Sequence, residues 1–152
     1  MVNRAEASLL AGRSAEQLTE AQIRSVANTF VGLDRNVPFQ HDSEGSTRFV
    51  VENDEAEEVG RVYFGPDIYP GRSVLDPNSA LSMKAAVAHE ISHFHRWLDR
   101  TELPLGEYRH LDEALASLDA ALRFANDLSS HEVQQLVRDA IQRLQMHRAE
   151  LP

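Results

Sequence analysis

The segment from Ser79 to Asp99 constrains the fold more than any other part of the chain, because its pattern predicts a helix with two unlike faces. The apolar stripe along one face consists of Met83, Val87, Ile91, Phe94 and Leu98. Trp97 lies at the edge of this stripe, and His89 and His93 project from nearly the opposite side. We therefore expect a helix that packs on the core with one face and presents two histidines to a cleft with the other.

The same helix contains the sequence His-Glu-Ile-Ser-His, an HExxH pattern. Two residues at i and i+4 on a helix lie roughly 40° apart around its axis and one turn apart along it, so His89 and His93 can reach one metal ion from the same side. Glu90 between them can reach a water that the metal activates and accept its proton. The pattern predicts a zinc site for hydrolysis, with Glu90 as the general base. His95 lies roughly 200° around the helix from His93 and is expected at the surface.

A zinc site of this kind takes a third protein ligand and leaves the fourth position to water. The next predicted helix, from about His110 to Leu128, offers three candidates. Asp112 falls on the side predicted to face solvent, whereas Glu113 falls on the shoulder of the apolar face, as suits a ligand directed at a neighbouring helix. We expect Glu113 to be the third ligand, with His110, which also lies near the inner face, as its rival.

The N-terminal half of the chain predicts a helix followed by a β-hairpin. Apolar residues at helical spacing indicate a helix from about 19 to 33, and Thr19 with Gln22 three residues later forms a capping-box pair. Thr47–Glu52 and Glu58–Phe64 are rich in β-branched and aromatic residues and are separated by an acidic stretch. They predict an antiparallel hairpin whose connection is a solvated turn.

Two segments predict irregular structure. Residues 34–45 are polar and contain a proline, and Gly65–Asn78 is rich in proline and glycine. Asn78 or Ser79 then caps the helix that carries the histidines.

A last helix is expected from about Ser130 to His147, opened by Ser129 or Ser130. Together the elements predict the α+β class: a small antiparallel sheet or hairpin packed on the HExxH helix, with two further C-terminal helices. We expect one domain that spans residues 1–152, since no linker divides the chain.

Charge and composition narrow the classes of function. The net charge is −9, with 24 acidic and 15 basic residues, so we expect no nucleic-acid partner. No apolar run approaches the roughly 18–20 residues that span a bilayer, and the N-terminal stretch lacks the features of a secretory signal. We therefore expect no membrane association and a cytoplasmic location. The chain has no cysteine, so its metal ligands must be His, Asp or Glu.

An HExxH helix followed by a glutamate on the next helix resembles the gluzincin branch of zinc metallopeptidases. The sequence AVAHEISHFHRW, preceded by a strand and followed by HLDEALASLDAALRFA, is most similar to small ImmA/IrrE-type proteins, over roughly residues 58–128. The resemblance implies a minimal zincin-like fold with one zinc ion. It also implies His89, His93 and Glu113 as ligands and Glu90 as the base.

The chain departs from the family pattern at three places. Ile91-Ser92 replaces the commoner Leu-Gly, and Asp112 precedes the glutamate ligand where the family often has another pattern. Ser117 stands where larger gluzincins usually place an aspartate that supports a histidine. Such supporting partners tune metal affinity. The sequence does not decide which residues support the ligands here.

Amide hydrolysis also needs a hydrogen-bond donor for the developing oxyanion and a surface that aligns the substrate. Tyr108 is the candidate for the donor, and the segment Gly60–Phe64 is the candidate for an exposed strand edge that pairs with a peptide. The other candidate donors are His110, Tyr63, Tyr69 and Arg72.

Two functions of different class follow from these residues. The first is a zinc metallopeptidase that cleaves a protein or peptide substrate, with a narrow target or a regulatory partner protein because a small domain has little room for a deep cleft. The alternative is a non-catalytic zincin-fold binding or regulatory module with structural zinc, for example in a bacterial defence or toxin–antitoxin system. Replacing Glu90 separates the two.

Overall fold

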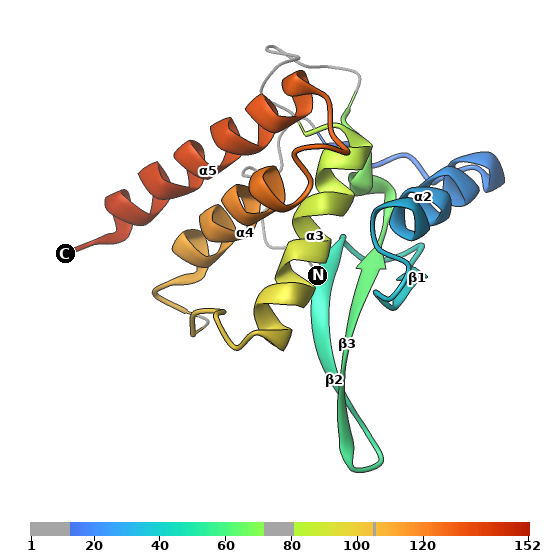
Figure 1. Cartoon of the computed structure of the whole chain (residues 1–152), viewed down its shortest axis with the longest axis horizontal. Coiled ribbons are helices and arrows are strands. Elements are labelled where there is room, and N and C mark those ends of the chain that lie inside the picture. Colours follow the sequence, from blue (N-terminus) through green and yellow to red (C-terminus); the bar gives the residue numbers. More distant parts are fainter. Residues whose placement is uncertain (1–12, 72–80, 105) are drawn as a thin grey trace.

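The computed structural model of the chain has an α+β architecture and describes residues 13–71, 81–104 and 106–152 (Figure 1). Over these residues we find four α-helices, a three-stranded sheet and a short 3-10 helix. The elements in chain order are α2 (Glu20–Leu33), β1 (Phe39–His41), β2 (Arg48–Asp54), β3 (Glu57–Phe64), the 3-10 helix η1 (Pro66–Ile68), α3 (Met83–Leu98), α4 (Arg109–Arg123) and α5 (Ser130–Glu150).

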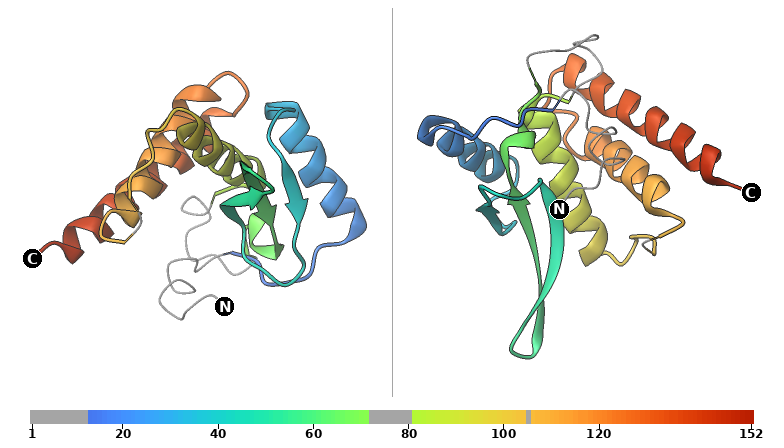
Figure 2. Two further views of the ribbon diagram at one scale, coloured as in Figure 1. Left: turned by 90° about the horizontal axis from the view of Figure 1, so that it is seen from below. Right: turned by 180° about the vertical axis from the view of Figure 1, so that it is seen from behind.

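Helix α3 lies at the centre of the described structure. It contacts the other three helices, η1, β2 and β3. Figure 2 shows α4 and α5 side by side on one side of α3, and the sheet with α2 on the other. The sequence predicted one buried face for this helix, but ten of its sixteen residues are buried. The expectation of histidines presented to a cleft is therefore wrong: His89 and His93 are 5% and 9% exposed and face a second packed layer.

The caps predicted for the first and last helices are confirmed. Thr19 caps α2, and its hydroxyl accepts from Gln22 N while the Gln22 side chain accepts from Thr19 N. Ser129 caps α5 in the same reciprocal way with Glu132. Each box satisfies two backbone N–H groups that a helix start leaves without partners, which fixes where the helix begins.

Three helices have ends that differ from the predictions. Helix α3 begins at Met83, because the Ser82 hydroxyl accepts a hydrogen bond from Ala85 N. The predicted caps Asn78 and Ser79 lie outside the described residues. Helix α4 ends at Arg123 and not near residue 128, and α5 runs to Glu150, three residues beyond the predicted end.

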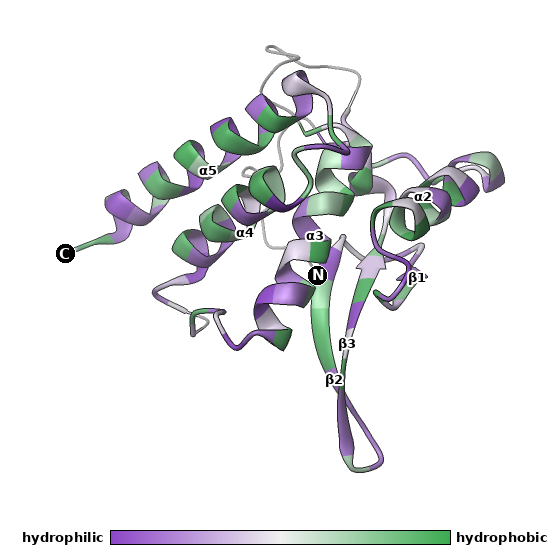
Figure 3. Cartoon of the chain, viewed as in Figure 1, coloured by the Kyte–Doolittle hydropathy of each residue, from purple (hydrophilic) through white to green (hydrophobic). Residues whose placement is uncertain are grey.

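The predicted hairpin is present and longer than expected. β2 and β3 pair antiparallel from Arg48↔Tyr63 to Asp54↔Glu57, so strand pairing continues into the acidic stretch. The chain reverses at Glu55, whose φ is 56°. Figure 3 shows that the far end of the hairpin is hydrophilic, whereas the part near α3 contains apolar residues. The acidic turn is thus a solvated end, and the apolar part lies on the core.

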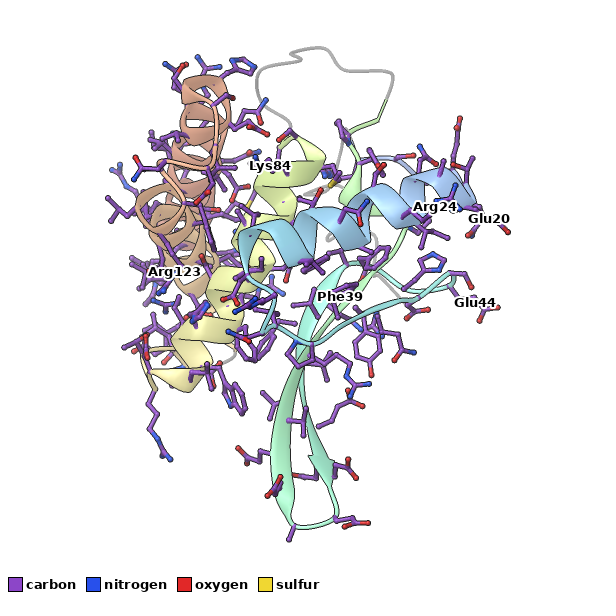
Figure 4. All side chains as sticks on the ribbon, turned by 45° about the vertical axis from the view of Figure 1, so that its right-hand side comes forward. Glu20, Arg24, Phe39, Glu44, Lys84 and Arg123 are labelled. Carbon is purple, nitrogen blue, oxygen red and sulfur yellow. The ribbon has the colours of Figure 1, made fainter. Side chains whose placement is uncertain are left out.

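A third strand, β1, lies in the segment 34–45, which was predicted to be a loop. It pairs parallel with β3, from Phe39↔Val62 to His41↔Phe64. A strand of three residues shows too little alternation to be found in a sequence. Tertiary packing forms it, because the Phe39 ring lies between α2 and the sheet (Figure 4) and stacks on Phe30 with centroids 4.7 Å apart.

The strand order β1-β3-β2 makes β3 the central strand. The prediction of an exposed edge at Gly60–Phe64 is therefore wrong for residues 62–64, which pair on both sides. Within the described residues, the long edge of the sheet belongs to β2. Phe49 of this strand contacts Phe94 and Trp97 of α3, with ring centroids 6.2 and 6.0 Å away.

The two sides of α3 are filled by residues of different size. Between α2, the sheet and α3 the core contains large side chains such as Phe30 and Phe64. Most of the buried residues of α4 are small, which permits a close approach between helices. These small residues are Ala114, Ala116, Ser117, Ala120 and Ala121. None of the helices in the described part of the chain is both long and apolar enough to cross a membrane.

Gly60 tests the contact between the hairpin and α3. A Cβ atom at this position would lie 2.8 Å from Phe49 Cζ and from two ring carbons of Trp97. We expect Gly60→Ala to lower the free energy of unfolding by about 1–3 kcal/mol, as overpacking does, in urea unfolding followed by circular dichroism.

Gly32 of α2 is the matched control, because a Cβ there meets nothing within 4 Å. We expect Gly32→Ala to raise the free energy of unfolding by up to about 1 kcal/mol, since alanine loses less backbone entropy in a helix. Equal effects of the two substitutions would contradict the close approach at Gly60.

Candidate metal centre

Three side chains that the sequence predicted as ligands come together between α3 and α4. His89 Nε2 lies 2.8 Å and His93 Nε2 lies 3.0 Å from the same oxygen, Glu113 Oε2. The two Nε2 atoms are 3.2 Å apart. One ligand atom from each residue therefore converges on a single point, in a group that has the composition of a metal site.

The spacing of these atoms fits a tetrahedral ion. With metal–ligand bonds of about 2.0–2.1 Å, the ligand atoms of a tetrahedral zinc site lie about 3.3 Å from one another. The three separations here, 2.8, 3.0 and 3.2 Å, are shorter by only a few tenths of an ångström. A small outward movement of each side chain would give the coordination distances.

Helix geometry explains the convergence. His89 and His93 are one turn apart on α3, and their rings meet edge to face with centroids 4.8 Å apart. Glu113 lies one turn after the start of α4, and its side chain reaches the two histidines of α3. Its side chain is 35% exposed, whereas the two imidazoles are 6% and 11% exposed. The cluster is therefore closed on the histidine side and reaches solvent through the carboxylate.

His110, the rival for third ligand, points elsewhere. Its Nε2 lies 3.1 Å from Glu150 Oε1 at the end of α5, and the residue is 4% exposed. Helix α4 packs against both α3 and α5, so a residue near its inner face can contact either neighbour. His110 contacts α5 and Glu113 contacts α3.

Asp112 was predicted to face solvent, and this prediction is wrong. The residue is 7% exposed. Its Oδ1 accepts from Arg96 at 2.5 Å and from Leu103 N at 2.8 Å, and its Oδ2 is 3.8 Å from His93 Nδ1. The prediction assumed that α4 has one buried side, whereas it has two. The signal in the sequence for a supporting group was an aspartate next to the predicted ligand near the start of a helix.

The second supporting group also comes from outside the predicted set. Ser117 Oγ lies 2.8 Å from His89 Nδ1 and donates to Asp139 Oδ2 at 2.6 Å. Asp139 is on α5, 22 positions from Ser117. A carboxylate thus supports His89 through a hydroxyl. Ser117 stood out in the sequence as a departure from the family pattern, whereas no sequence pattern indicated Asp139.

The charges of the cluster perturb its titration. Burial alone would lower the pKa of His93, but the charge of Glu113, the hydrogen bond to it and the charges of Glu90 and Asp112 outweigh burial and raise the pKa to about 9. Burial would raise the pKa of Glu113, yet the charge of His93 and hydrogen bonds from His89 and His93 hold it well below its usual range. In the metal-free protein the pair is therefore an imidazolium and a carboxylate.

Glu90 adjoins the cluster on α3 and is half-buried. Burial raises the pKa of its carboxyl above the usual range, the charges of His89 and His93 oppose this, and those of Glu113 and Asp67 add to it. A carboxylate with a raised pKa is a stronger base, which suits proton abstraction near neutral pH.

The structure does not join the candidate oxyanion donors to the cluster by hydrogen bonds within the described residues. Tyr108 is 40% exposed, and its ring lies beside that of His147, with centroids 6.4 Å apart. Tyr63 donates to Glu52 Oε1 on the hairpin at 2.6 Å. Arg72 lies outside the described residues.

The remaining candidate donor and His95 lie on the other side of α3. Burial raises the pKa of Tyr69, and a hydrogen bond with Ser25 of α2 opposes this. His95 was expected at the surface, but it is half-buried and its Nε2 lies 2.6 Å from Asp34 Oδ2 at the end of α2. His93 therefore belongs to the cluster, whereas His95, two residues later, joins α3 to α2.

Comparisons with protein-family models, with curated proteins and with solved structures found no match to this chain.

The pKa of His93 gives a direct test of the cluster. We expect NMR titration of the metal-free protein to give a value near 9 for its imidazole. Glu113→Gln should lower this pKa, because the main charge that favours the imidazolium is removed. An unchanged pKa in the variant would contradict the contact.

The pKa of His93 also determines how the stability of the metal-free protein changes with pH. The folded pKa of about 9 lies above the unfolded value of 6.5. The pair therefore stabilises the metal-free protein fully below pH about 6.5, and this contribution is lost as the pH rises through about 9.

Proposed function

We propose that the chain is a zinc-dependent peptidase in which His89, His93 and Glu113 bind one zinc ion and Glu90 is the general base. The observation that carries the proposal is the convergence of the three ligand atoms at nearly tetrahedral spacing. Two imidazoles and one carboxylate are a donor set of catalytic zinc sites, which leave one position for water. The resemblance of the HExxH helix and the next helix to gluzincins and ImmA/IrrE-type proteins supports the same reading.

In this proposal the zinc ion, Glu90 and Glu113 have different roles. Zinc, when bound, supplies a Lewis acid for the substrate carbonyl and increases the acidity of a water. Glu90 takes the proton of the attacking water and passes it to the leaving nitrogen. Glu113 is the exposed ligand, so substrate approaches from its side of the cluster.

The sheet supports a peptide as the substrate. The edge of β2 is unpaired within the described residues, and this strand packs on α3 through Phe49. An extended peptide that adds to this edge would lie alongside the helix that carries the ligands. We propose a protein or peptide substrate, with a narrow target or a regulatory partner protein, in a cytoplasmic setting.

One observation favours the non-catalytic alternative. Both histidines are almost fully buried, as ligands of structural zinc sites are. In that case the zinc would hold α3 to α4 in a binding or regulatory module, and Glu90 would have no chemical role. Metal content and the effect of Glu90 therefore need separate measurements.

Metal analysis tests the ligands. We expect purified protein reconstituted with zinc and desalted to hold one zinc per chain, and His93→Ala to hold none at the same protein concentration, because two ligands bind the ion far more weakly than three. His131→Ala, which removes an exposed histidine of α5, is the control and should retain the metal. Equal zinc in wild type and His93→Ala would refute the assignment.

Glu90→Gln tests catalysis. We expect zinc-loaded wild type to cleave members of a peptide library, detected by mass spectrometry. The variant should keep its zinc and lose at least about 100-fold in rate, as removal of a general base does. Cleavage at the wild-type rate would exclude Glu90 as the base, and no cleavage by zinc-loaded wild type would favour the non-catalytic module.

A further inference from the structure

The contacts of His89 on the side away from the ligand cluster form an unbroken chain to α5. His89 Nδ1 lies 2.8 Å from Ser117 Oγ, and Ser117 Oγ lies 2.6 Å from Asp139 Oδ2. Ser117 is fully buried, and the side chain of Asp139 is 16% exposed. Asp139 also lies 3.7 Å from Arg143 one turn further along α5. Three helices are thus joined through the hydroxyl of Ser117.

The direction of each hydrogen bond follows from the number of protons available. A serine hydroxyl has one proton, and a carboxylate can only accept. The separation of 2.6 Å between Ser117 Oγ and Asp139 Oδ2 is typical of a hydroxyl that donates to a charged carboxylate. The proton of Ser117 is therefore committed to Asp139, and the hydroxyl oxygen must accept from Nδ1–H of His89.

This direction keeps a proton on Nδ1 of His89. A neutral ring with its proton on Nδ1 has its lone pair on Nε2, so once an ion replaces the hydrogen bond between Nε2 and Glu113 the ring has the tautomer that binds the ion. A ring with the opposite tautomer would present an N–H to the ion and could not bind it. Among the residues that the structure describes, His93 has no equivalent bond, since its Nδ1 is 3.8 Å from Asp112 Oδ2.

We propose that Ser117 and Asp139 form a positioning relay that holds His89 in the Nδ1–H tautomer and so sets the metal affinity of the site from α5. The two residues act through His89 and not on substrate. The inference rests on the role of His89 as a ligand in the proposed function. It assigns a purpose to a carboxylate on the last helix that no sequence pattern indicates.

The first measurement uses the metal-free protein, so that it is independent of zinc. We expect two-bond ¹H–¹⁵N spectra of wild type to show a protonated Nδ1 on His89. Ser117→Ala removes the acceptor, and Asp139→Ala frees the hydroxyl proton to donate to Nδ1, so both variants should show an unprotonated Nδ1. A protonated Nδ1 in both would overturn the relay.

The second measurement is zinc affinity by competition with a chromophoric chelator. We expect Ser117→Ala and Asp139→Ala each to weaken binding by about 10–100-fold, the usual effect of losing a partner behind a metal-ligating histidine. The double variant should bind zinc as Ser117→Ala does, because Asp139 reaches His89 only through Ser117. Additive losses, or wild-type affinity in Asp139→Ala, would overturn the relay.

Asp119→Ala is the matched control. Asp119 pairs with Arg123 at i,i+4, as Asp139 does with Arg143, but it has no contact with Ser117. We expect this variant to keep the wild-type affinity and the wild-type tautomer. If wild type binds no zinc, the proposed metal site is refuted, and the tautomer measurement still tests the relay. If wild type binds zinc and both variants keep the wild-type tautomer, the relay alone is refuted.

Discussion

Two imidazoles buried against α4 need polar partners, and this requirement constrains how α3 and α4 are arranged. A buried polar group without a partner costs free energy, so His89 and His93 must be satisfied on both ring nitrogens or lie beside charge. Glu113 reaches both Nε2 atoms, Ser117 serves Nδ1 of His89, and Asp112 lies near Nδ1 of His93. All three partners are on α4. Its register against α3 is therefore tied to the cluster as well as to the packing of small side chains.

The surroundings of the two histidines are unlike, and this has consequences for the site. Asp112 is held by Arg96 and Leu103 N, so its charge acts on His93 without a hydrogen bond. Together with Glu113 it favours the protonated form of His93, and a metal must displace that proton. The Nδ1 of His89 instead lies against the hydroxyl of Ser117. The two candidate ligands thus differ: His93 lies beside a second charge, whereas His89 is hydrogen-bonded to a buried hydroxyl.

Much of the fold and of the candidate ligand cluster could be predicted because both depend on local spacing. The i, i+4 separation places His89 and His93 together whatever surrounds α3, and Glu113 was found from its place on the shoulder of an apolar face. The hairpin and the capping boxes are equally local. By contrast, β1 is formed by the stacking of Phe39 on Phe30. Asp112 was misplaced because a helical wheel with one apolar face assumes one packed neighbour.

The sequence by itself determined which groups share a helix face, where the capped helices α2 and α5 begin and which residue types are available for a metal. These properties follow from backbone periodicity and from hydrogen bonds within a few residues. Only the tertiary structure decided that α4 packs against both α3 and α5, that His110 contacts Glu150, and that Asp139 is joined to His89 through Ser117. The reason is physical: which side of a helix is buried depends on how many neighbours it packs against, and that number is set by the whole chain.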